Sequence, residues 1–206
     1  MTGVLALSLV AAYLMGSIPT AYLAGRANGV DLRTVGSGNL GATNVFRTLG
    51  WKWGLLVYVV DLLKGVIPVL WLPGVSGVER GWPWGVAFGV ASIFGHVRPI
   101  FLLGKGGGKG VATASGVFLA LAPIAALCAF AAFVLVVAAT RFVSLGSLVG
   151  ALVLPLVLVA QQRAATPLVL ASAAVCAFVF WTHRENISRL RQGAERRIGR
   201  TEDVRK

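Results

Sequence analysis

The chain has 206 residues, of which 57% are hydrophobic and 13% charged, and its mean hydropathy is +0.81. A soluble domain carries charge on about a quarter of its residues, so this composition excludes an ordinary soluble protein. It predicts one integral membrane domain over residues 1–206. The net charge of +12 indicates orientation in the membrane and contact with anionic lipid headgroups rather than nucleic-acid binding.

Apolar segments, taken in chain order, predict an all-α polytopic membrane fold. The first runs from Gly3 to Gly25; it lacks the basic leader of a signal peptide, so we expect an uncleaved helix. Further spans are predicted at residues 53–71, 83–103, 111–139, 142–160 and 167–181. Residues 111–139 exceed the roughly 20 residues that cross the hydrocarbon and have Pro123 near their middle. They form either one long tilted helix or two helices that meet at Pro123.

The distribution of cations favours seven spans over six. With seven, sixteen of the nineteen Lys and Arg residues fall on one side of the membrane, while Arg80 and Arg163 fall on the other and Lys64 lies within a span. The positive-inside rule places the larger group in the cytoplasm. The N-terminus is then outside, the C-terminus is inside, and every polar cluster of the sequence faces the cytoplasm.

The first polar cluster is "GSGNLGATNVFRTLG", residues 36–50. Its glycines allow close approach of the backbone to a ligand, and Ser37, Asn39, Thr43 and Asn44 favour turns and helix caps. A helix is expected to begin near Ala42, and its free N–H groups would form an anion site. Arg47, one turn later, adds a forked donor suited to phosphate. The alternative is a glycine-rich connector with an interfacial arginine.

The second cluster is "GHVRPIFLLGKGGGKGVAT", residues 95–113. Lys105 and Lys109 flank three glycines directly before a helical segment, which again combines flexible backbone, cations and a helix N-terminus. It is not a Walker A loop, since Leu103 and Gly110 stand where that pattern needs Gly and Ser or Thr. His96 is a candidate proton donor, although a single histidine near a helix end is more often structural.

The third cluster, "HRENISRL", follows the last predicted span and brings together His183, Glu185 and Asn186. A juxtamembrane helix that contacts anionic lipid explains its arginines but not this His, Glu and Asn. Two smaller features are Ser144 in "TRFVSLGS" and the pair Asp61 and Lys64, which share a helix face within a span. We expect a structural ion pair there, because an isolated charge in the membrane costs roughly 2.5–3.5 kcal/mol.

These three motifs resemble those of a known family. Together with "GSIPTAYL", "DLLKG" and "TRFVSLGS", the resemblance covers nearly the whole of this chain. The family is that of the bacterial acyl-phosphate-dependent glycerol-3-phosphate acyltransferases (the PlsY family). The resemblance implies a seven-helix enzyme of phospholipid synthesis in the bacterial cytoplasmic (inner) membrane, with its active site facing the cytoplasm. Such an enzyme transfers an acyl group from acyl phosphate to the 1-hydroxyl of sn-glycerol 3-phosphate, giving lysophosphatidic acid and phosphate.

The resemblance also implies roles for individual residues. Ser37, Arg47, His183 and Asn186 match catalytic positions. Glu185 is expected to order its turn by pairing with a neighbouring cation, and Asp61 and Lys64 are expected to be structural. The residues expected to bind substrate are Gly36, Gly38, Asn39, Thr43, Asn44, His96, Lys105, Gly107, Gly108, Lys109, Gly110 and Ser144.

The sequence departs from the family in Arg98, where an aromatic residue is usual, and in a third glycine between the lysines. Which of Lys105 and Lys109 reaches phosphate therefore stays open. So does the removal of the hydroxyl proton, either by His183 as general base or by a substrate phosphate, which we favour. No metal or cofactor and no obligate protein partner is expected.

Two alternatives remain beside the enzyme. A transporter for an organic phosphate would use the basic loops and the Asp61–Lys64 pair, but the charges gather at one face rather than along a path, and no inverted repeat is visible. A scaffold that binds anionic lipid would use the basic tail alone. Deleting residues 192–206 is expected to spare an enzyme and to inactivate a scaffold.

Overall fold

The computed structural model describes residues 2–79, 81–161 and 167–199. All regular elements in these ranges are helical, as the composition predicts. They are, in chain order, α1 (Thr2–Ser17), α2 (Thr20–Ala27), α3 (Ala42–Leu49), α4 (Trp51–Ser76), α5 (Trp82–Val97), the 3-10 helix η1 (Ile100–Leu102), α6 (Val111–Leu121), α7 (Pro123–Thr140), α8 (Val143–Ala160), α9 (Pro167–Thr182) and α10 (Arg184–Arg191).

Five helical segments in the described ranges are long and apolar enough to cross a membrane: residues 3–27, 51–76, 82–102, 123–140 and 143–160. Helices α9 and α10 together make a sixth candidate that is bent by 59°. Helix α6 has 11 residues, fewer than the roughly 20 that span the hydrocarbon. The count of seven spans and the orientation therefore stay predictions; Arg80 and Arg163, on which the orientation partly depends, lie outside the described residues.

Prolines break two of the predicted spans. Residues 111–139 form two helices, since Ala122 is non-helical (φ −148°, ψ 69°) and α7 begins at Pro123, where proline is compatible with a first helical turn. The first span, expected as one helix, is also interrupted: α1 ends at Ser17, α2 begins at Thr20, and Pro19 lies between them.

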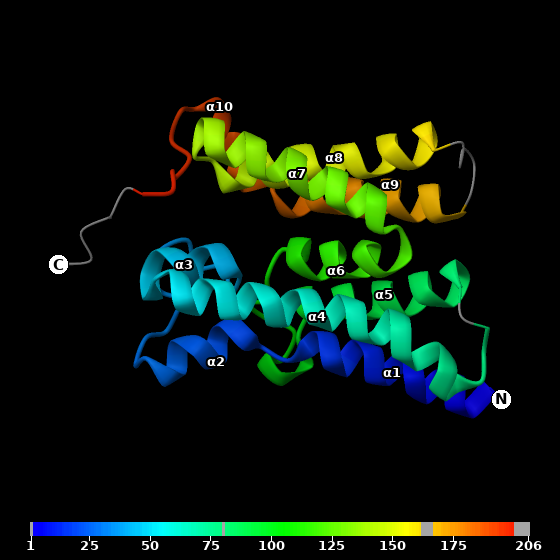
Figure 1. Cartoon of the computed structure of the whole chain (residues 1–206). Coiled ribbons are helices and arrows are strands. Elements are labelled where there is room, and N and C mark those ends of the chain that lie inside the picture. Colours follow the sequence, from blue (N-terminus) through cyan, green and yellow to red (C-terminus); the bar gives the residue numbers. More distant parts are fainter. Residues whose placement is uncertain (1, 80, 162–166, 200–206) are drawn as a thin grey trace.

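The helices form two packed groups (Figure 1). Helices α1, α4, α5 and α6 pack together, and α7, α8 and α9 form the second group, which α6 and α5 contact. Small residues permit this close packing, as is usual in membrane helices. At the crossing of α4 and α6, a Cβ atom on Gly65 would lie 2.1 Å from the Thr113 carbonyl oxygen, and one on Gly116 would lie 2.0 Å from that of Leu62.

The polar clusters gather at one end of the bundle. Helices α3 and α10 and the last described residues lie at that end, and the N-terminus lies at the opposite end (Figure 1). The sequence clusters around residues 36–50, 95–113 and 183–190, far apart in the chain, are thereby brought together.

Candidate functional site

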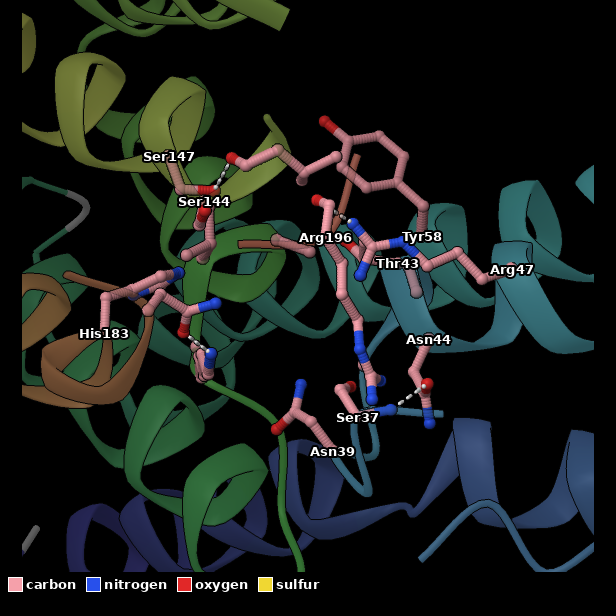
Figure 2. A pocket seen from close by; sticks show the side chains of 18 of the residues that line it. Ser37, Asn39, Thr43, Asn44, Arg47, Tyr58, Ser144, Ser147, His183 and Arg196 are labelled. Carbon is pink, nitrogen blue, oxygen red and sulfur yellow. Dashed lines mark hydrogen bonds between the residues drawn. The ribbon is translucent and has the colours of Figure 1, made fainter. Parts of the chain in front are cut away.

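A cavity of about 250 Å³ opens at the polar end, between the two helix groups. Residues from all three polar clusters line it, and Figure 2 shows His183 and Ser144 on one side with Arg47 and Asn44 on the other. The predicted site residues in its lining are Gly36, Ser37, Asn39, Thr43, Asn44, Arg47, Asp61, His96, Lys109, Gly110, Ser144, His183 and Asn186.

Asn44 fixes the shape of the first loop. Its side chain is fully buried, and its amide donates to the carbonyls of Leu32 (3.2 Å) and Val35 (3.1 Å). Its Oδ1 accepts from the backbone N–H of Ser37 at 2.9 Å. Gly36 passes over this oxygen with a φ of +63°, and a Cβ atom there would lie 2.3 Å from it. Asn44 therefore holds the loop, while Ser37 and Asn39 present their side chains to the cavity.

The cavity meets the first turns of two helices. Helix α3 begins at Ala42, as predicted, and α6 begins at Val111 after Gly110, whose φ is +83°. Residues of both first turns line the cavity. Backbone N–H groups at helix N-termini and the helix dipole favour anions, so this arrangement suits phosphate.

The second loop presents Lys109 to the cavity and Lys105 to solvent. The Lys109 ammonium donates to Asn186 Oδ1 across the site, whereas Lys105 and Arg98 are exposed and outside the lining. Gly38 is likewise absent from the lining, and Gly107 and Gly108 lie behind it, against a second, water-sized cavity. The geometry thus favours Lys109 as the anion-binding lysine.

The third cluster is held by a carboxylate that the sequence analysis missed. Glu185 is exposed in the first turn of α10, while Glu195, in the tail, is buried. Glu195 Oε1 accepts from Asn186 (2.7 Å) and Ser144 (2.9 Å), and its Oε2 pairs with Arg189 at 2.9 Å. The carboxylate that holds the third cluster in place is therefore Glu195, whereas Glu185 was expected in that role.

Burial by itself raises the pKa of the Glu195 carboxyl, but hydrogen bonds from Asn186, Arg189 and Ser144 outweigh it and the net pKa is lowered. An ionised Glu195 keeps the Asn186 amide donating to it, so Asn186 Oδ1 faces Lys109. Glu195 thereby joins the tail to the third cluster and, through Asn186, to Lys109 of the second.

The tail also contacts the first cluster. The Arg196 carbonyl accepts a hydrogen bond of 2.9 Å from the Arg47 guanidinium, and the N–H of Ile198 donates to the Arg141 carbonyl at 2.9 Å. Figure 2 shows Arg196 between the two sides of the cavity. These contacts give Glu195 and Arg196 a place in the site. We therefore now expect deletion of residues 192–206 to impair an enzyme, and the effect of that deletion stays a prediction.

Five lining residues with polar side chains were not among the predicted site residues: Tyr58, Ser147, Arg189, Glu195 and Arg196. Helical spacing could have found two of them, because Ser147 and Arg189 each lie three residues after a predicted site residue and so share its helix face. No sequence signal distinguished Glu195 and Arg196 from the other residues of a basic tail. In the part of the chain that the structure describes, no group of three or more His, Cys, Asp or Glu residues is arranged to hold a metal ion.

An apolar pocket of about 80 Å³ adjoins the polar cavity and shares Tyr58, Val111, Phe133 and Ser147 with it. The rest of its wall comes from α6, α7, α8 and α9 and is mostly Ala, Phe, Leu and Val. A ligand at this boundary can place an anionic group in the cavity and a hydrocarbon segment between the helices.

The charge of Lys109 predicts the pH dependence of anion binding. Its pKa is lowered from 10.5 to about 8, chiefly by burial and then by the positive charge of Arg189, against the opposing effect of Glu195. A bound dianion favours the ammonium, so affinity is present below about pH 8 and falls as the pH rises through it. We expect the KM for an anionic substrate to rise above pH 8, measured as initial rates between pH 6.5 and 9.5.

The variant Lys109→Arg is the control, because a guanidinium keeps its charge throughout that range. This variant should bind the anionic substrate more weakly than wild type at neutral pH, but its KM should not rise above pH 8. A rise that persists unchanged in Lys109→Arg would assign the pH dependence to another group.

These features define a polytopic helical membrane protein that binds anions where its polar end meets an apolar interior. A family model described as glycerol-3-phosphate acyltransferase matches residues 6–193, and the chain belongs to this family. It is thus a multi-pass membrane acyltransferase.

Curated relatives include glycerol-3-phosphate acyltransferases from Geobacter sulfurreducens and Thermus thermophilus. The first is 50% identical over 188 residues, covering 91% of this chain and 94% of the relative. The second is 44% identical over 200 residues, covering 96% and 97%. In both comparisons the similarity extends over almost the full length of the two proteins.

Two crystal structures of PlsY (YgiH), an integral membrane glycerol 3-phosphate acyltransferase, have the same fold. The glycerol 3-phosphate form is 40% identical with a TM-score of 0.86, covering 95% of this chain and 96% of that one. The lysophosphatidic acid form is 39% identical with a TM-score of 0.82, covering 95% of each.

Proposed function

We propose that this protein transfers an acyl group from acyl phosphate to the 1-hydroxyl of sn-glycerol 3-phosphate, giving lysophosphatidic acid and inorganic phosphate. It would carry out this first step of phospholipid synthesis in the bacterial cytoplasmic membrane, with its site facing the cytoplasm. The observation that supports the proposal most strongly is the continuity of the cation-lined cavity with the apolar pocket.

The donor is inferred from chemistry. Acyl phosphate is a mixed anhydride whose carbonyl is already activated and whose leaving group is an anion. Arg47, Lys109 and the first turns of α3 and α6 are suited to bind that leaving phosphate and the phosphate of glycerol 3-phosphate. The acyl chain would occupy the apolar pocket and place the carbonyl near Ser144 and Ser147.

In the transfer, the acceptor hydroxyl oxygen attacks the carbonyl carbon, and the bond from that carbon to the phosphate oxygen breaks. The hydroxyl proton passes to a phosphate oxygen. The protein positions both substrates and stabilises developing negative charge. His183 and Asn186 would orient the glycerol 3-phosphate.

His183 is arranged to accept a hydrogen bond from a hydroxyl group of glycerol 3-phosphate. Its Nδ1 lies 2.8 Å from the Val179 carbonyl; a carbonyl only accepts, so Nδ1 carries the hydrogen and Nε2 of the neutral ring is an acceptor. Replacing His183 by Gln retains polar contact and should therefore lower kcat by no more than about 100-fold. A loss beyond about 10⁴, the top of the usual range for acid–base catalysis, would identify His183 as the general base instead. Single-turnover rates measure this directly.

The apolar pocket should set the acyl-chain preference. Ala151 lines it, and Ala151→Leu would fill part of it. We expect kcat/KM for palmitoyl phosphate to fall about tenfold relative to a short-chain acyl phosphate, while the KM for glycerol 3-phosphate stays unchanged. Leu152→Phe, on the adjacent exposed position of α8, is the matched control and should leave the ratio unchanged. Equal losses for long and short donors would exclude this pocket as the acyl site.

The proposal is tested by mixing purified protein with palmitoyl phosphate and glycerol 3-phosphate and following lysophosphatidic acid and phosphate. Equimolar release of both products is expected. Release of product only with acyl-CoA or acyl carrier protein donors would overturn the acyl-phosphate assignment. Folded protein that is inactive with every donor would instead favour transport of an organic phosphate.

A further inference from the structure

Three buried ionisable side chains lie at the base of the cavity: Asp61 and Lys64 of α4 and His96 of α5, which are 2%, 5% and 7% exposed. Asp61 and His96 reach the cavity lining, and Lys64 does not. Ionisable groups at this depth cost energy unless each has a partner. Lys64 Nζ donates to Asp61 Oδ1 at 2.5 Å and to the Ile18 carbonyl, also at 2.5 Å. Lys64 thereby satisfies a carbonyl at the break between α1 and α2, and the predicted Asp61–Lys64 pair is present.

Asp61 also faces the histidine. His96 Nδ1 lies 3.8 Å from Asp61 Oδ1, within reach of electrostatic attraction, and the Nε2 edge of the ring lies against the glycine-rich loop. A Cβ atom on Gly108 would lie 2.1 Å from His96 Nε2. The N–H of Gly108 donates to the His96 carbonyl at 3.2 Å. The loop therefore lies directly on the imidazole ring.

The glycine before Gly108 is packed just as closely. A Cβ atom on Gly107 would lie 2.2 Å from the Val97 carbonyl oxygen. Immediately after Gly108, the Lys109 carbonyl accepts from the Thr182 hydroxyl at 3.3 Å, and the Lys109 ammonium reaches Asn186. The position of the loop on α5 thus determines where the Lys109 ammonium enters the cavity.

We propose that Asp61 and His96 form a buried positioning unit that fixes the glycine-rich loop and so places the Lys109 ammonium for phosphate. The proposal rests on the proposed function, in which Lys109 binds substrate phosphate. His96 is here a positioning residue that acts through Gly108, rather than a group that exchanges protons with substrate. Lys64 neutralises Asp61, so the unit adds no net charge to the membrane interior.

The close contact of ring and loop gives a reciprocal test. Gly108, unlike Gly106 with its φ of +70°, has no positive φ, so Gly108→Ala introduces a clash without imposing backbone strain. His96→Asn keeps a donor near Asp61, in place of Nδ1, and removes the edge that contacts Gly108. We expect Gly108→Ala to raise the KM for glycerol 3-phosphate about tenfold or more, and the double variant to return to within about threefold of wild type.

A second double-mutant cycle, with His96 and Lys109 as its two positions, tests whether His96 acts through Lys109. His96→Asn alone should raise the KM with kcat changed less than about threefold, and should have no further effect in a Lys109→Met background. This cycle does not depend on whether Gly108→Ala folds. Independent, multiplying losses in either cycle would overturn the proposal. A loss of kcat beyond about 100-fold in His96→Asn at saturating substrates would also overturn it, since the ring would then act on the reacting groups.

Calorimetric binding of inorganic phosphate to the same variants separates the two proposals. If wild-type protein transfers no acyl group from any donor, the proposed function fails, yet phosphate affinity still reports on Lys109. Weaker phosphate binding in His96→Asn, absent in the Lys109→Met background, supports the positioning unit. Unchanged phosphate binding in His96→Asn contradicts it.

Discussion

Replacing Arg47 by alanine is expected to lower kcat/KM for acyl transfer by about 100-fold or more. Arg47 lies in α3, lines the cavity, and can offer a phosphate two parallel charge-assisted hydrogen bonds. Each such bond contributes about 1.5–3 kcal/mol, and a tenfold change corresponds to about 1.4 kcal/mol. The measurement is the initial rate of phosphate release from palmitoyl phosphate as glycerol 3-phosphate is varied.

Two variants separate geometry from charge. Arg47→Lys keeps the charge but loses the fork, so it should recover only part of the activity. Arg98→Ala removes an exposed cation outside the cavity lining and should stay within about twofold of wild type. If Arg47→Lys were fully active, a point charge would suffice. If Arg98→Ala lost as much activity as Arg47→Ala, the effect would come from the general positive potential of this end of the protein.

The helices could be predicted from the sequence because hydrophobicity and proline act locally. Both possible outcomes at Pro123 were foreseen, and the structure has the broken form. The break at Pro19 was not foreseen, since the surrounding segment is apolar on both sides. At this break the Ile18 carbonyl accepts a hydrogen bond from the distant Lys64 ammonium, and such tertiary contacts leave no periodic signal.

The site was predictable where residue type and local spacing carry the chemistry. Glycines followed by a helix start and a cation located Arg47 and Lys109. The sequence could not choose between Lys109 and Lys105, because three glycines between them leave the direction of each side chain undetermined. Glu195 was missed for a different reason: its partners Ser144 and Asn186 belong to other elements, and in the sequence it is one acid within a basic tail.

The largest effect outside the three sequence motifs is expected at Glu195. Glu195→Ala removes the shared acceptor of Ser144, Asn186 and Arg189. The donors of Ser144 and Asn186 are buried, and each that is left without a partner costs about 1–3 kcal/mol. We expect a lower unfolding temperature and a loss of kcat/KM of about 100-fold, because Asn186 is then free to rotate away from Lys109. Thermal unfolding in detergent and the acyl-transfer assay measure the two effects separately.

Glu195→Gln distinguishes the shape of this side chain from its charge. Its amide oxygen can still accept from Asn186 and Ser144, but the charge opposite Arg189 is lost. It should therefore recover most of the stability and only part of the activity. Truncation of the chain before Glu195 should match Glu195→Ala or be worse. A truncated protein with full activity would show that the tail covers the site without organising it, and would restore the view that the basic tail serves only to contact lipid.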